Sequence, residues 1–123
     1  MMDRDTWLRR ILDAIRDLAD EHYQERVWVR AEGPEVDSST EALVRLLHDY
    51  ELNAFIAEAG DKVWVSKDQL AALRTLENAL ESYVSRDHGS SGEAARIASP
   101  AWRRVRKLAN ATLETFAARA ASA

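Results

Sequence analysis

The sequence contains no cysteine, which excludes disulfide bonds, thiolate catalysis and cysteine-ligated zinc. It has only four glycines, and they form no phosphate-cradling loop, so we expect no nucleotide site of a known type. No uninterrupted apolar run approaches the roughly 18 residues that span a bilayer. The first five residues carry both charges and do not resemble a secretory signal. Together these absences predict a cytoplasmic protein with no membrane contact.

Motifs for metal or nucleophilic chemistry are also missing. Helical bundles that hold two metal ions use a Glu-x-x-His motif, but the residues three before the histidines are Ala19, Arg45 and Ser85. The residue types of a catalytic triad occur together only at 87–91, on one glycine-flanked connector that cannot hold their geometry. We therefore predict no metal, no cofactor and no catalytic residue, with an enzyme of unfamiliar site as an alternative.

Helical periodicity is the strongest signal that the sequence does contain. Apolar residues recur every three to four positions over about 5–24, 39–50, 66–85 and 99–116. Ser38, Ser66 and Ser99 precede three of these stretches as cap residues, and Pro100 suits a first helical position. Shorter helices are predicted near 52–60 and 93–98. The fold class is mostly α: one domain over residues 1–123, a compact bundle of four main helices, with a tail that frays from about 117.

Two similar segments interrupt this pattern, because a base precedes Val-Trp-Val in both 26–29 and 62–65. Valine favours strand over helix slightly. One prediction is a minimal two-stranded β ribbon that pairs Val27 to Val29 with Val63 to Val65. The alternative is that these are ordinary core residues in loops or at helix ends.

The charge of the chain is distributed unevenly. The net charge is −4, which argues against a general nucleic-acid binder. The stretch 32–61 nevertheless holds eight acids and one base. The acids are Glu32, Glu35, Asp37, Glu41, Asp49, Glu51, Glu58 and Asp61. This acidic segment predicts either a solvated face or a surface that attracts a basic protein partner.

Two tryptophans flank or lie close to the acidic segment. If Trp28 and Trp64 are partly exposed, they would supply the aromatic anchors that protein interfaces favour. The alternative is that both belong to the core.

The last predicted helix begins with the basic cluster Arg103, Arg104, Arg106 and Lys107. Positive charge at this end opposes the helix dipole, so another group must compensate it. That group is an acid of the first two helices, an external anion or nucleic-acid phosphate, or an acidic protein. An alternative function is therefore a DNA- or anion-binding regulatory domain. Residues 86–98 are too long a link for a helix-turn-helix, which makes nucleic acid the weaker prediction.

A small, acidic, cysteine-free helical chain with such an acidic segment resembles the immunity proteins of bacterial toxin systems. The resemblance is carried by the eight acids of 32–61 and covers about a quarter of the chain. It implies a protein-binding module that neutralises a cognate, basic toxin in the bacterial cytoplasm and has no catalytic role. A helical domain with another role is the remaining alternative, and no feature indicates an oligomeric state.

Overall fold

The computed structural model describes residues 3–86 and 92–122, and all regular structure in these ranges is helical. In chain order the elements are α1 (Arg4–Ala19), α2 (Glu21–Tyr23), η1 (Gln24–Val29), α3 (Ser39–Val44), η2 (Arg45–Asp49), α4 (Leu52–Asp61), α5 (Lys67–Ser85), α6 (Glu93–Ala98) and α7 (Pro100–Ser122). The two η elements are π-helical turns. None of the described helices is long and apolar enough to cross a membrane.

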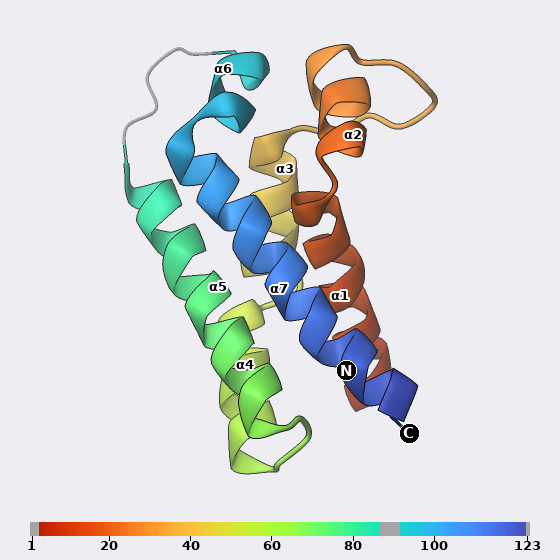
Figure 1. The fold of residues 1–123 in the computed structure, drawn as a ribbon, viewed down its shortest axis with the longest axis vertical. Coiled ribbons are helices and arrows are strands. Elements are labelled where there is room, and N and C mark those ends of the chain that lie inside the picture. Colours follow the sequence, from red (N-terminus) through yellow and green to blue (C-terminus); the bar gives the residue numbers. More distant parts are fainter. Residues whose placement is uncertain (1–2, 87–91, 123) are drawn as a thin grey trace.

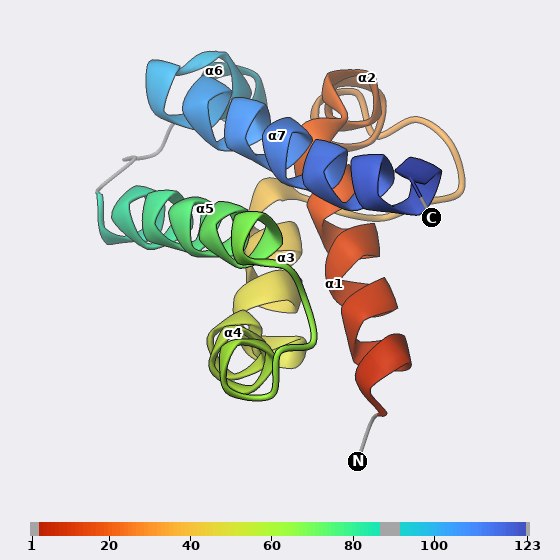
Figure 2. The same cartoon turned by 60° about the horizontal axis from the view of Figure 1, so that its bottom comes forward.

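The helices form a bundle in which α7 runs alongside α5, crosses α1 and contacts both (Figures 1 and 2). α3 and η2 pack on α1, whereas α4 packs on α5 and η2. The apolar stripes predicted from the sequence meet in one core. Its fully buried side chains include Ile11, Ile15, Leu18, Leu46, Phe55, Leu73, Leu76, Leu80 and Trp102. The predicted mostly α fold is confirmed.

The serine caps predicted from the sequence are present. The Ser66 hydroxyl accepts a hydrogen bond from the Gln69 backbone N–H, and the Gln69 side chain accepts one from the Ser66 N–H. Ser38 caps α3, and Ser99 caps α7 by accepting from the Trp102 N–H at 3.2 Å. Of the connector predicted over 87–92, residues 87–91 lie outside the described residues. The predicted tail from about 117 does not end the last helix, because α7 continues to Ser122.

The first two predicted helices are each divided. The chain leaves the helical conformation at Asp20, whose side chain then caps α2 by accepting from the Tyr23 N–H at 3.0 Å. The second predicted helix changes from α3 into η2, and Glu51 follows with a left-handed φ of 47°. The sequence pattern is continuous across both changes, so periodicity did not reveal them.

The predicted β ribbon is not formed by the described residues. Val27 and Trp28 are buried within η1. The Trp28 ring packs edge-on against the Trp102 ring, with the ring centroids 5.6 Å apart. Tertiary packing of this apolar pair therefore outweighs the slight strand preference of valine.

The second Val-Trp-Val segment forms the turn between α4 and α5. Val63 has a φ of 56°, and the Trp64 N–H closes the end of α4 by donating to the Ala59 carbonyl at 2.9 Å. A helix commonly ends on such a left-handed residue, but glycine usually occupies the position. The backbone donor of Trp64 is used for helix capping and is not free for a strand ladder.

Candidate interaction surfaces

The acidic segment does not form one continuous face, because arginines of the same chain engage its first members. Arg26 binds Glu35 through two hydrogen bonds of 2.9 and 3.1 Å, and these bonds lower the pKa of Glu35 to about 2. Arg30 lies 2.7 Å from a carboxylate oxygen of Glu32. Both pairs are exposed, and pairs of this kind add little stability.

The side chain of Asp37 is buried, although the sequence suggested that it meets a partner. Only 3% of its side chain is exposed. It accepts hydrogen bonds from the Tyr23 hydroxyl at 2.8 Å, the Trp28 indole at 3.0 Å and Arg45 at 2.9 Å. Burial acts to raise the pKa of Asp37, but these three bonds outweigh it and the pKa is lowered.

Arg45, the single base of the acidic segment, connects Asp37 to α1. Its second Nη atom lies 3.3 Å from Asp17. Burial raises the pKa of Asp17 and Arg45 opposes that effect. The three charged groups therefore hold the loop before α3 against α1, and their role is structural.

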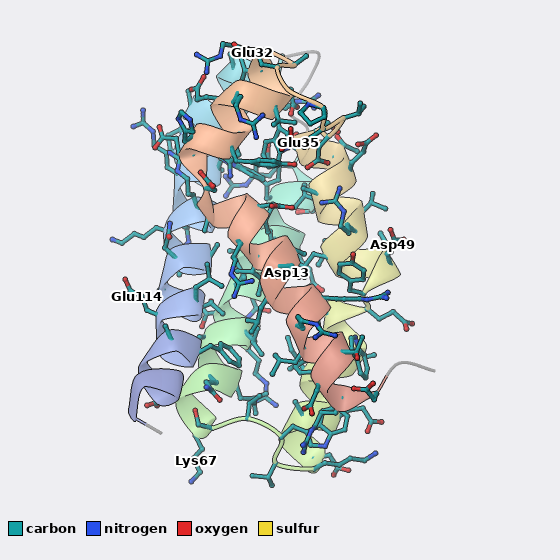
Figure 3. The ribbon with its side chains drawn as sticks, turned by 90° about the vertical axis from the view of Figure 1, so that its right-hand side faces the viewer. Asp13, Glu32, Glu35, Asp49, Lys67 and Glu114 are labelled. Atoms are coloured by element: carbon teal, nitrogen blue, oxygen red, sulfur yellow. The ribbon has the colours of Figure 1, made fainter. Side chains whose placement is uncertain are left out.

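Four members of the acidic segment remain exposed without an ion pair to any described residue. They are Glu41 on α3, Asp49 at the end of η2, Glu51 before α4 and Asp61 at the end of α4. Glu58 differs, since Lys62 lies 2.8 Å from it. Figure 3 shows Asp49 on the α3–η2 side, while Glu32 and Glu35 lie at the far end of the bundle. We name Glu41, Asp49, Glu51 and Asp61 the exposed acids.

The two candidate tryptophan anchors lie in different environments. Trp28 is buried between Tyr23 and Trp102, so it belongs to the core and cannot anchor a partner. Trp64 is half-buried against Trp7 and Phe55, with ring centroids 6.2 and 5.8 Å away. Trp64 therefore keeps some exposed surface beside α4.

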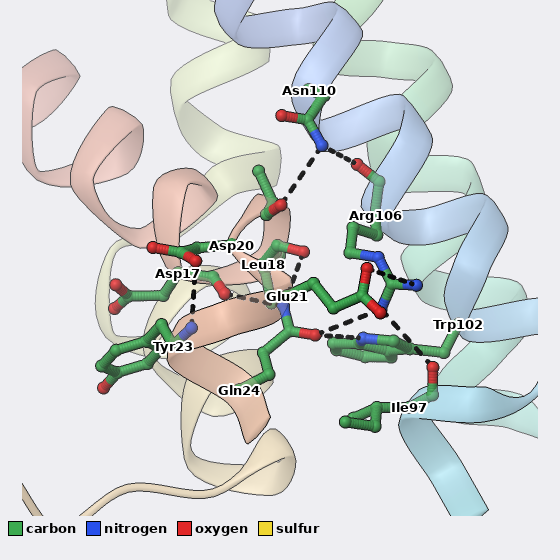
Figure 4. A network of polar contacts seen from close by, with 11 residues as sticks. Asp17, Leu18, Asp20, Glu21, Tyr23, Gln24, Ile97, Trp102, Arg106 and Asn110 are labelled. Atoms are coloured by element: carbon green, nitrogen blue, oxygen red, sulfur yellow. Dashed lines mark hydrogen bonds and ion pairs between the residues drawn. The ribbon is translucent and has the colours of Figure 1, made fainter. Parts of the chain in front are cut away.

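The basic cluster also contains both an inward-facing residue and exposed residues. Arg106 turns inward, 3.6 Å from Glu21, and also donates to the Ile97 carbonyl at 3.5 Å (Figure 4). Arg103, Arg104 and Lys107 are exposed and form no ion pair within the described ranges. An acid of the first predicted helix thus compensates one of the four charges.

Gln24 is a buried polar residue that the sequence analysis did not single out. Its Nε2 donates to the Asp17 and Leu18 carbonyls at 2.9 Å each, and its Oε1 accepts from the Trp102 indole at 3.0 Å (Figure 4). It therefore satisfies carbonyls that the end of α1 leaves without helical partners. The local sequence around Gln24 contains no pattern that would distinguish it from a solvent-exposed glutamine.

A groove between α3–η2 and the end of α5 is the second feature that the sequence did not reveal. It consists of two adjoining cavities of about 300 Å³ each, which share Leu47, His48 and Val84. The first cavity is also lined by Ser39, Thr40, Leu43, Val44, Tyr83 and Arg96, and the second by Asn53, Glu77, Glu81 and Ser85. We call this feature the α3–α5 groove.

Glu77 is the unusual residue of the α3–α5 groove. The residue is only 8% exposed, and its Oε2 atom has no hydrogen-bond partner in the described chain. Burial raises the pKa of Glu77 and the nearby Glu81 adds to this, while Asn53 and Arg74 oppose it. A carboxylate in this setting carries a desolvation cost that a pairing cation would offset.

Comparisons of the chain with protein-family models, curated proteins and solved structures found no match. The described residues also contain no group of three or more histidine and carboxylate side chains arranged to hold a metal ion. The candidate sites are therefore judged on their own geometry.

Proposed function

We propose that this chain is a protein-binding module that captures a basic partner through the exposed acids, in the manner of an immunity protein that neutralises a bacterial toxin. The observation that supports it is that Glu41, Asp49, Glu51 and Asp61 lack counter-ions among the described residues, whereas Glu35 and Asp37 have them. Unpaired surface carboxylates on neighbouring elements create a negative field that attracts a basic protein.

The proposed binding surface contains fewer residues than the surface predicted from the sequence. The partner-binding acids are reduced to those that are exposed and have no counter-ion among the described residues, since the Asp37 side chain and Trp28 are buried and Glu32, Glu35 and Glu58 are paired. Because exposed charges contribute mainly to association rate and specificity, apolar contacts must supply much of the affinity.

The test is affinity capture from an extract of the source cells with two matched variants. The variant E41K/D49K/E51K reverses three exposed acids, and E25K/D68K/E114K changes the net charge equally at exposed sites elsewhere. We expect the wild type and the control E25K/D68K/E114K to retain a basic protein. The variant E41K/D49K/E51K should not retain it. Co-expression of the chain with that protein should then restore growth. Equal retention by both variants would contradict the proposal.

A second candidate function, anion binding by the start of α7, is favoured by one specific observation. Arg104 and Arg86 both line a polar cavity of about 340 Å³ between α5 and α7, together with Thr75, Asn78 and Ser82. Titration with duplex DNA and with inorganic pyrophosphate at several salt concentrations tests it. Binding that weakens with salt and is lost in R86E/R104E supports this function, and the absence of binding at about 50 mM salt rejects it.

A further inference from the structure

We infer that the α3–α5 groove receives an amphipathic segment of the partner, whose apolar side chains fill the first cavity and whose lysine or arginine pairs with Glu77. This inference rests on the proposed function, because it states which part of a basic partner enters the domain.

The walls of the groove present apolar surface to solvent. Val44 on α3 is 43% exposed and Val84 on α5 is 54% exposed, and both line the first cavity. They are two of the four large apolar side chains that are exposed in the described chain, and the other two, Val36 and Val63, lie in a loop and a turn. Apolar surface gathered on both sides of one hollow is typical of a docking groove.

Glu77 provides an independent observation that points to a cation. Glu77 lines the second cavity and is more than nine-tenths buried, and its Oε2 atom has no hydrogen-bond partner among the described residues. Glu81 lines the same cavity and adds negative charge, and η2 contributes His48 while α4 contributes Asn53. An ammonium or guanidinium group that enters here gains a charge-assisted hydrogen bond in a poorly solvated site.

The two ends of the groove differ in charge, which fixes the direction of the occupant. Arg96 lines the first cavity, but Glu93 lies 3.3 Å away and compensates its charge. The second cavity carries Glu77 and Glu81, and the exposed Asp49 follows His48 on the same element. A bound segment therefore places its basic residue at the Glu77 end and its apolar residues between Val44 and Val84.

The probes are three synthetic 14-residue peptides added to the ¹⁵N-labelled full chain. One alternates leucine and lysine at helical spacing, one replaces every lysine by glutamate, and one replaces every leucine by glycine. We expect only the leucine–lysine peptide to bind, with NMR shift changes centred on Val44, Leu47 and Val84. The Val84→Asp variant should raise its Kd about tenfold or more, because a charge is placed in the apolar wall. The matched Val36→Asp control should leave the Kd unchanged.

The variant Glu77→Gln separates a binding role from a structural one. It removes the charge at nearly constant shape, so the Kd for the leucine–lysine peptide should rise about fivefold or more while the Tm of the free chain also rises. A carboxylate that served only the fold would lower the Tm when replaced. Glu114→Gln, which removes an exposed charge on α7, should change neither quantity.

Other results would overturn the inference. The inference fails if the glutamate peptide binds equally well, if no peptide binds, or if Glu77→Gln leaves the Kd unchanged. NMR shift changes confined to the exposed acids would reject binding in the α3–α5 groove and leave the proposed function standing. The proposed function is tested separately by the affinity capture with E41K/D49K/E51K. Self-association that Val84→Asp abolishes would assign the groove to a second copy of the chain and also overturn the inference.

Discussion

The Asp37→Asn variant removes the charge from a carboxylate that holds three hydrogen-bond donors at once. The introduced amide keeps one acceptor oxygen, while its NH₂ group faces either Arg45 or the two donors of Tyr23 and Trp28, which share the other oxygen of Asp37. At least one buried donor is left unpaired, and Arg45 loses its closer counter-ion. We therefore expect a destabilisation much larger than that of a surface substitution.

The magnitude follows from the burial of Asp37. Breaking a buried ion pair by removing one partner costs about 3–5 kcal/mol, and the Asp37 side chain is only 3% exposed, whereas that of Arg45 is 29% exposed. Arg45 remains close to Asp17 at 3.3 Å, which favours the lower part of that range. For a domain of this size a loss of about 3 kcal/mol lowers the Tm by about 12 °C, against a total stability of about 5–15 kcal/mol.

Urea and thermal unfolding of Asp37→Asn at pH 7 measure this loss, with Asp49→Asn as the exposed, unpaired control. The pKa of Asp37 is lowered in the folded state, so its contribution is complete above the ordinary value of 3.8 and is lost as the pH falls through the lowered pKa. The gap between wild type and variant should therefore shrink below pH 3.8. A loss under about 1 kcal/mol at pH 7, or one matched by the control, would refute the structural role assigned to Asp37.

Three further substitutions test other parts of the structure. Val63→Gly should raise the free energy of unfolding by about 1 kcal/mol, because it relieves a β-branched residue held at a φ of 56°; Val36→Gly is the control that should give no gain. Glu77→Gln should stabilise the free chain by about 1 kcal/mol at pH 7. The pKa of Glu77 is raised, so its cost appears only as the pH rises above 4.5, and unfolding at pH 4 should show no gain. Gln24→Ala should lose about 3 kcal/mol, since two carbonyls and the Trp102 indole lose their buried partner; a loss below about 1 kcal/mol in urea unfolding would contradict this.

The periodic and capping patterns of the sequence were sufficient to predict much of the helical framework. They predicted α5 and the start of α7 closely, and they predicted the serine caps at Ser38, Ser66 and Ser99. These features depend on residues three or four positions apart, so they are readable without tertiary information. The break at Asp20 and the π-helical turns were not predicted, because the partners that stabilise them are distant in sequence.

In the candidate sites, the difference between what local sequence predicts and what distant contacts decide is larger. The sequence identified an acidic segment, but it could not separate Asp37, which three distant or cross-loop donors surround, from Glu41, which solvent surrounds. It placed the basic cluster correctly at a helix start, and it left open which charges are compensated within the chain. Arg106 alone turns toward Glu21, because the break after α1 brings Glu21 beside α7.

The sequence by itself determined that this chain is helical, acidic in its middle and basic at the start of its last helix, since composition and local spacing decide these properties. The tertiary structure decided which charges stay free. It enclosed Asp37, Gln24 and Trp28, and it left an apolar groove with Glu77 at one end. Burial depends on which helices meet, and the contacts that make these helices meet join residues far apart in the chain.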